Sequence, residues 1–128
     1  MTVRLFTAND AKWHQHTDRQ VFLGDVLDPS NSAAMSVGFI RYEAGARNEW
    51  IVTYDEALIV IKGAYTVRSD EGAKTATAGE VLFLTKGTNV VYEAAEHTEV
   101  VYVTYPHWME AQAKSEHAAM LDSFHPVN

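Results

Sequence analysis

The segment that most constrains the fold of this chain runs from Gly45 to Gly63 and has a glycine at each end. Its second half, residues 57–61, is an apolar run with the length of a buried strand. Glu56 stands at the head of that run, with six residues between it and Gly63. Because glycine permits tight turns, we expect a strand enclosed by turns, with a carboxylate at its start.

Short strands follow one another at close spacing through most of the chain. The expected strands cover residues 3–6, 21–27, 35–43, 50–54, 57–62, 65–69, 75–77, 81–84, 90–93 and 99–105. This spacing predicts a β-sandwich or β-barrel rather than βαβ units. The tail from His107 to Phe124 contains neither Gly nor Pro and is rich in good helix formers. We therefore expect one all-β domain over residues 1–128, with strands over 3–106 and a C-terminal α-helix over 107–124.

The composition narrows the classes of partner. Apolar residues make up 47% of the 128 residues, which is enough for a core, and there is no cysteine to form a disulfide or a thiolate metal site. The net charge of −7, without a basic cluster, argues against nucleic acid and anionic lipid as partners. We see no signal peptide and no membrane-spanning segment. A cytoplasmic protein with a small-molecule ligand fits these features.

A second segment framed by glycine runs from Gly79 through Gly87 to Ala94. Together the two segments resemble the two signature motifs of the cupin superfamily, which implies a small jelly-roll barrel. In cupins, three histidines and a glutamate from these motifs hold a metal ion. Here Trp50, Val52 and Val90 stand at the three histidine positions, and of the four ligands only Glu56 is left. The resemblance therefore implies the cupin fold without the usual metal and without a cofactor.

Further residues resemble a narrower family, the cupin domain of the ethanolamine-utilisation Q proteins (EutQ). They are Trp50, the run Tyr54-Asp55-Glu56, the pair Lys62-Gly63, and Tyr102-Val103 followed by Pro106. The resemblance covers roughly residues 35–108, and that family has also replaced the metal-binding histidines. Acetate kinase activity has been attributed to the Q protein. This sequence has no P-loop and no glycine-rich phosphate cradle, so the motifs do not carry that activity over.

The resemblance places Glu56 in an apolar interior, where burial raises the pKa of a carboxyl group. A carboxyl group with a pKa nearer neutrality is suited to general acid–base catalysis. Tyr92 lies two residues after Val90, hence on the same strand face, and we expect Glu56 and Tyr92 to be catalytic. The expected substrate-binding residues are Trp50, Tyr54, Tyr42, Tyr102, Val52 and Val90. Tyrosines in strands are also common packing residues, so each of these tyrosines could belong to the core instead. Lys86 lies on the loop of the second motif and is either a solvated lysine or a contact for an anion.

Three functions remain open from the sequence. The first is a metal-independent enzyme acting on a small polar metabolite, as an isomerase, lyase or group-transfer enzyme with Glu56 as acid or base. The second is a non-catalytic small-molecule-binding or accessory protein of amine or ethanolamine catabolism, as the family resemblance implies. The third is a metal cupin with unusual ligands drawn from Glu56, Tyr54, and His14 or His16, although the two histidines also read as a solvated loop.

The last expected strand, residues 99–105, also bears on assembly. From Val100 to Val103, the residues that point to each of the two faces of the strand are apolar. Both faces of this strand should therefore be covered. We expect a homodimer, because cupins commonly protect exposed strand edges by packing across a two-fold axis.

Overall fold

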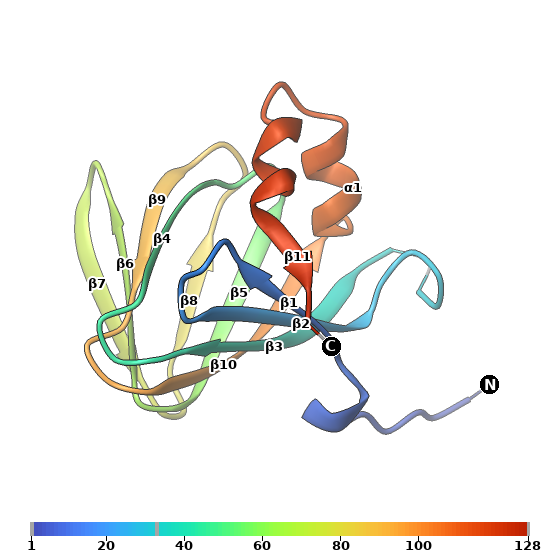
Figure 1. Cartoon of the computed structure of the whole chain (residues 1–128), viewed down its shortest axis with the longest axis horizontal. Helices are drawn as coiled ribbons and strands as arrows, with labels where there is room; N and C mark the ends of the chain where they lie inside the picture. Colours follow the sequence, from blue (N-terminus) through green and yellow to red (C-terminus); the bar gives the residue numbers. More distant parts are fainter. Residues whose placement is uncertain (1, 33, 128) are drawn as a thin grey trace.

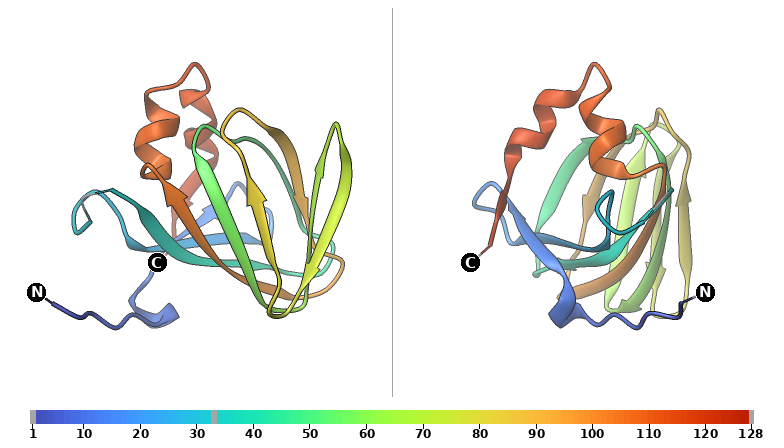
Figure 2. Two further views of the ribbon diagram at one scale, coloured as in Figure 1. Left: turned by 180° about the vertical axis from the view of Figure 1, so that it is seen from behind. Right: turned by 90° about the vertical axis from the view of Figure 1, so that its right-hand side faces the viewer.

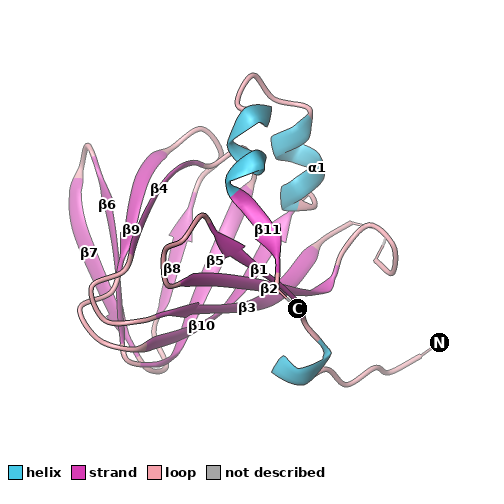
Figure 3. Cartoon of the chain, viewed as in Figure 1, coloured by secondary structure: helices cyan, strands magenta, loops and turns pink. Residues whose placement is uncertain are grey.

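The computed structural model describes residues 2–32 and 34–127, and these residues form two antiparallel sheets that close into a barrel (Figures 1 and 3). In spatial order the larger sheet contains β11 (Phe124–Pro126), β1 (Lys12–His16), β2 (Val21–Leu27), β3 (Ser36–Tyr42), β10 (Thr98–Tyr105), β5 (Asp55–Lys62) and β8 (Val81–Leu84). The smaller sheet contains β4 (Arg47–Ile51), β9 (Asn89–Glu93), β6 (Ala64–Ser69) and β7 (Gly72–Thr77). The predicted all-β jelly-roll is confirmed.

Side chains alternate between the barrel interior and its outer surface, as a pleated strand requires. In β3, in β10 and in β5 up to Val60, the even-numbered residues are buried and the odd-numbered ones are more exposed. In β4 and β9 the even-numbered residues again point inward. The interior is unusually rich in phenols, since the five tyrosines with an exposed fraction of 6% or less are Tyr42, Tyr54, Tyr65, Tyr92 and Tyr102.

One glycine inside a strand, Gly38 of β3, marks a close approach between neighbouring strands. A Cβ atom at this position would overlap the hydroxyl group of Tyr102 on the neighbouring strand β10. The missing side chain therefore lets the Tyr102 ring lie flat across β3 toward β2.

The C-terminal segment differs from the expected helix over residues 107–124. It begins as a short helix α1 (Trp108–Ala113), continues as a 3₁₀ helix η2 (Ala118–Ser123), and ends in strand β11, which pairs with β1. The break has a local cause: the Ser115 hydroxyl donates to the Gln112 carbonyl at 2.7 Å and accepts the His117 N–H at 3.0 Å. Serine competes with helical hydrogen bonds in this way. Figures 1 and 2 show the folded-back segment standing at one end of the barrel.

Two N-terminal expectations also change. Residues 3–6 are extended but pair with no strand among the described residues, and Val3 and Leu5 are 100% and 88% exposed. His14 and His16 lie in β1 rather than in a loop, because this segment pairs with β2 on one side and with β11 on the other. None of the helices in residues 2–32 and 34–127 has the length and apolarity that crossing a membrane requires.

Candidate functional site

An internal cavity lies between the two sheets, at the end of the barrel that the C-terminal segment covers. The space open to the centre of a water molecule is about 20 Å³, enough for about one or two waters. Its lining is aromatic apart from a few polar and aliphatic groups, and consists of Leu23, Ile40, Tyr42, Asn48, Trp50, Tyr54, Glu56, Tyr65, Tyr92, Trp108 and Phe124. The cavity is therefore a small aromatic chamber with one carboxyl group.

Glu56 provides that carboxyl group from the second residue of β5, where it is 6% exposed. The Tyr92 hydroxyl donates to Glu56 Oε1 at 2.8 Å, so this hydrogen bond crosses the barrel from β9 to β5. Burial raises the pKa of Glu56 to about 7, although the hydrogen bond from Tyr92 acts in the opposite direction. Near neutral pH, Glu56 can therefore either donate or accept a proton.

The surrounding phenols are held neutral. Burial raises the pKa of Tyr54, Tyr65 and Tyr92 well above the ordinary value, and the negative charge of Glu56 adds to the effect. Trp50 Nε1 donates to the Tyr54 hydroxyl oxygen at 2.9 Å, which fixes that ring in the loop before β5. The rings of Tyr65 and Tyr92 are stacked, with centroids 5.8 Å apart. These phenols act as hydrogen-bonding groups rather than as bases.

Asn48 adds a second polar group to the chamber. It lies on β4 directly opposite Tyr92 of β9, and it is 3% exposed. Its Oδ1 atom is buried and has no hydrogen-bond partner among the described residues. Burying an oxygen atom without a hydrogen bond costs free energy of folding. A ligand with an N–H or O–H donor, bound in the cavity, would remove that cost.

Three aromatic rings close the cavity toward the C-terminal segment. Trp50, Trp108 and Phe124 contact one another edge to face, with centroid separations of 6.2, 5.5 and 5.7 Å. Trp108 begins α1 and Phe124 begins β11, so two of these three rings belong to the segment that follows the last barrel strand. We call these three residues the aromatic roof.

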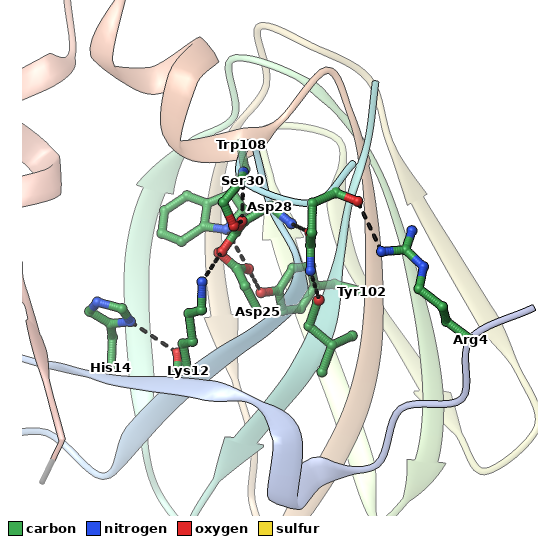
Figure 4. A network of polar contacts seen from close by, with 10 residues as sticks. Arg4, Lys12, His14, Asp25, Asp28, Ser30, Tyr102 and Trp108 are labelled. Carbon is green, nitrogen blue, oxygen red and sulfur yellow. Dashed lines mark hydrogen bonds and ion pairs between the residues drawn. The ribbon is translucent and has the colours of Figure 1, made fainter. Parts of the chain in front are cut away.

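A second buried carboxyl group, Asp25 on β2, anchors the roof (Figure 4). It accepts hydrogen bonds from Trp108 Nε1, at 2.9 Å, and from the hydroxyl group of Tyr102. Asp25 is 6% exposed, and burial raises its pKa to about 7 despite the hydrogen bond from Trp108. Asp25 itself does not line the cavity. Because both donors bond to Asp25, this network holds Trp108 in position.

Five of the eight expected site residues line the cavity: Glu56, Tyr92, Trp50, Tyr54 and Tyr42. The other three are buried elsewhere. Tyr102 turns toward Asp25, Val90 borders two surface grooves beside β9, and Val52 borders a groove next to the loop of residues 85–89. Lys86 is exposed, and its backbone N–H donates to Asp55 Oδ1 at 3.0 Å.

The sequence did not predict seven residues of the site: Leu23, Ile40, Asn48, Tyr65, Trp108 and Phe124 in the lining, and Asp25 behind the roof. Strand alternation contains a signal for two of them. Asn48 is two residues before Trp50, and Asp25 follows Val21 and Leu23 at even spacing, so each shares a face with a core residue. No local pattern predicts that Phe124, at the end of an expected helix, returns to the barrel.

Within residues 2–32 and 34–127, the lining of the chamber contains one carboxyl group and no histidine. Among the described residues, no group of three or more His, Asp or Glu side chains is arranged to hold a metal ion. His16 packs its ring against Phe124 at 4.9 Å, and His14 Nδ1 faces the carbonyl oxygen of Lys12. The arrangement is suited instead to moving a proton at Glu56 in a pocket shielded from solvent.

Comparison with known proteins identifies the family of this chain. A sequence profile described as ethanolamine utilisation protein EutQ matches residues 3–110. A curated protein named acetate kinase EutQ, from Escherichia coli K12, is 30% identical over 86 residues. The aligned part is 67% of this chain and only 36% of that relative, so the chain spans about a third of the relative's length.

Solved structures agree with this assignment. An ethanolamine utilisation protein Q from Salmonella typhimurium LT2 matches with a TM-score of 0.65 and 29% identity, over 68% of this chain and 70% of that one. An RmlC-like cupin from Shewanella frigidimarina has a TM-score of 0.67 at 13% identity, over 82% and 92% of the two chains, which supports the fold alone. The chain has a jelly-roll cupin fold and belongs to the EutQ family of ethanolamine utilisation proteins.

Proposed function

We propose that the barrel binds a small polar metabolite and that Glu56 transfers a proton to or from it, without a metal ion. The observation that carries the proposal is the position of Glu56: a buried carboxyl group with a pKa near 7, facing a cavity and hydrogen-bonded to Tyr92. A general acid or base works best when its pKa lies near the working pH. Isomerisation and elimination both begin with such a proton transfer.

The surrounding residues have defined roles in this proposal. Tyr92 orients the carboxyl group through the 2.8 Å hydrogen bond and stabilises its ionised form. Trp50, Tyr54 and Tyr42 form the walls that position the substrate. Because the cavity has room for only one or two water-sized groups, a larger substrate requires the surrounding side chains to shift.

Deuterium exchange tests the proton transfer without knowledge of the natural substrate. Glycolaldehyde, dihydroxyacetone and pyruvate carry C–H bonds made acidic by a carbonyl group, and proton NMR in D₂O follows the loss of those hydrogens. We expect the wild-type protein to accelerate exchange for at least one probe, with a rate that rises with pH and levels off above about pH 7.

The matched variants are Glu56→Gln, which should abolish the acceleration, and Glu71→Gln, which makes the same charge change at an exposed hairpin. Acceleration that survives in E56Q, or no acceleration by the wild-type protein with any probe, would overturn the proposal.

Phosphoryl transfer to acetate is a second candidate, favoured by the names of the curated relatives. Those relatives are much longer than the region they share with this chain, so the activity of the whole relative is carried over here only as a hypothesis. Incubation with ATP, Mg²⁺ and acetate, followed by phosphorus NMR, distinguishes the two candidates. Formation of acetyl phosphate by the wild-type chain would support the kinase.

Metal independence is part of the proposal and has its own test. Elemental analysis of untagged, dialysed protein should give far less than one first-row metal ion per chain, because such sites need at least three good donors. Near-stoichiometric metal would favour the third function considered from the sequence, a cupin with unusual ligands.

A small-molecule-binding protein without catalysis remains the outcome if ligands bind and no exchange occurs.

We also infer a homodimer. The outer faces of β3, β10, β5 and β8 carry an apolar row in register, in which Phe39, Val101, Ile59 and Val81 are neighbours. Val81 is 58% exposed and Phe83 67% exposed at the edge of this sheet. A second copy packed on this face would cover both.

The cytoplasmic location expected from the sequence stays a prediction.

A further inference from the structure

Two hydrogen-bond acceptors in the cavity, the Glu56 carboxylate and the Asn48 amide oxygen, can accept further hydrogen bonds. Glu56 receives one hydrogen bond, from Tyr92, and no Lys, Arg or His among the described residues forms an ion pair with it. Asn48 adds a buried oxygen without a partner. In this small space the carboxylate therefore has one hydrogen-bond donor, and the amide oxygen has none among the described residues.

The aromatic residues of the lining also favour a positively charged ligand. The face of an aromatic ring carries partial negative charge and attracts cations within about 6 Å of its centroid. Two tryptophans, four tyrosines and one phenylalanine line the cavity, which are Trp50, Trp108, Tyr42, Tyr54, Tyr65, Tyr92 and Phe124. A carboxylate, an unpaired oxygen and ring faces all favour a ligand that is positively charged and rich in N–H donors.

We propose that the cavity binds a small primary ammonium ion, through an ion pair with Glu56, a hydrogen bond to Asn48 Oδ1 and contact with the surrounding aromatic rings. This inference rests on the proposed function only in placing the ligand inside the barrel. An ammonium group has three N–H donors, so it can serve Glu56 and Asn48 together. In that position Glu56 can also accept one ammonium proton, which leaves the neutral amine and a protonated carboxyl group.

The size of the cavity limits the ligand. With about 20 Å³ open to the centres of water molecules, the chamber accommodates an ammonium group and little more. A chain of one or two further carbon atoms requires the aromatic roof to shift. Small ammonium ions should therefore bind better than bulky ones such as tetramethylammonium, which also lacks N–H donors.

Binding should depend on pH in a direction set by Glu56. The titratable groups that face it are the phenols of Tyr42 on β3, Tyr54 before β5, Tyr65 on β6 and Tyr92 on β9, all with a raised pKa, so they stay neutral. Asp25 lies farther off, and its charge affects Tyr54. Only ionised Glu56 can form the ion pair, so affinity should fall about tenfold per pH unit below about pH 7.

Titration of ¹⁵N-labelled protein with ethanolammonium chloride, followed by NMR chemical shifts at about pH 8, tests the inference. Ethylene glycol is the neutral probe of similar shape, and acetate is the anionic probe. We expect ethanolammonium to bind with a dissociation constant on the order of millimolar, as befits a ligand of so few atoms. It should bind at least about tenfold more tightly than ethylene glycol or acetate.

Three variants refine the test. Glu56→Gln should weaken binding about 10- to 100-fold, which corresponds to the loss of a charge-assisted hydrogen bond. Asn48→Leu, of similar size, should weaken it by a smaller factor. Glu71→Gln changes the net charge equally at an exposed hairpin and should bind as wild type does. Thermal unfolding of each variant shows whether it is folded before the titration is interpreted.

The outcomes separate this inference from the proposed function. If ethylene glycol or acetate binds as well as ethanolammonium, if E56Q binds as tightly as wild type, or if no ammonium ion binds, the ammonium site is wrong. Deuterium exchange by the wild-type protein in that case would leave the proposed proton transfer standing. Ammonium binding that depends on Glu56, without any exchange, would support the site and overturn the catalysis.

Discussion

At the scale of single residues, Glu56 makes the stability of the protein depend on pH. Its pKa is about 7 in the folded chain, against an ordinary value of 4.5. A raised pKa means that the folded state holds the proton more tightly than the unfolded state. The resulting stabilisation is fully present below about pH 4.5 and is lost as the pH rises through about 7.

Glu56→Gln removes this titration while keeping the shape of the side chain. Between about pH 5 and about pH 8 the wild-type free energy of unfolding should fall by more than that of E56Q, by up to about 3 kcal/mol. Urea unfolding at the two pH values measures the difference. Asp25→Asn should have a parallel effect, since the pKa of Asp25 is also raised to about 7 by burial. Equal pH dependence in wild type and E56Q would show that Glu56 does not titrate in this range.

The hydroxyl group of Tyr92 gives a second prediction at this scale. Because its hydrogen bond favours the ionised carboxylate, Tyr92→Phe should raise the pKa of Glu56 further. Carbon-13 NMR of labelled glutamate side chains follows the titration directly. Tyr54→Phe is the control, since the Tyr54 hydroxyl is bonded to Trp50 rather than to Glu56. A similar rise in both variants would point to a general change in burial instead.

The sequence predicted single residues well where a motif fixed their position. Glu56 and Tyr92 could be placed because their spacing from glycines and from the former ligand positions sets the strand face. Asn48 and Asp25 follow the same alternation, but a polar residue at an inward position looks like part of a turn or an exposed edge. Only the tertiary structure shows that Asp25 meets Trp108, which is 83 residues away in the sequence.

At the scale of elements, the hydrogen bond from the Trp108 side chain to Asp25 helps to hold α1 on the barrel, beside bonds from Trp108 N to Ser36 Oγ and from Thr53 Oγ1 to Gln112 Oε1. Trp108→Phe keeps the ring in the aromatic roof but removes the N–H donor and leaves the buried carboxyl group with one partner fewer. We expect a loss of about 1–3 kcal/mol in the free energy of unfolding, measured in urea.

Trp13→Phe is the matched control for this variant. Trp13 Nε1 donates to the carbonyl oxygen of Ala8 at 3.1 Å, near the surface, and this acceptor can bond to water instead. The cost should be well below that of W108F. Equal costs in the two variants would contradict an anchoring role for Asp25.

Elements differed in how well the sequence predicted them. The strands from β2 to β10 were placed to within a few residues, because period-two alternation and glycine turns are local signals. The C-terminal segment was not, since good helix formers fill it and its true path depends on Ser115 and on packing against the barrel. Tertiary contacts overrode helix propensity there.

At the scale of the whole molecule, the proposed dimer depends on the outer face of the larger sheet. Phe83 is 67% exposed on β8, at the edge of that face. Phe83→Lys should place a charge in the interface and yield a monomer by light scattering at concentrations where wild type is a dimer. Ala73→Lys, on the exposed surface of β7, is the control and should leave the dimer intact. A wild-type monomer would contradict the inference directly.

The aromatic roof has a consequence for how such a pocket can diversify. The family match ends at residue 110 and Phe124 lies beyond it, so the roof combines Trp50 and Trp108 from the matched region with one ring from outside that region. A tail that follows the last barrel strand can change in length or composition without shifting the register of any pair from β2 to β10. Substitutions in this short tail can thus alter which ligand the chamber admits while the barrel strands keep their pairing.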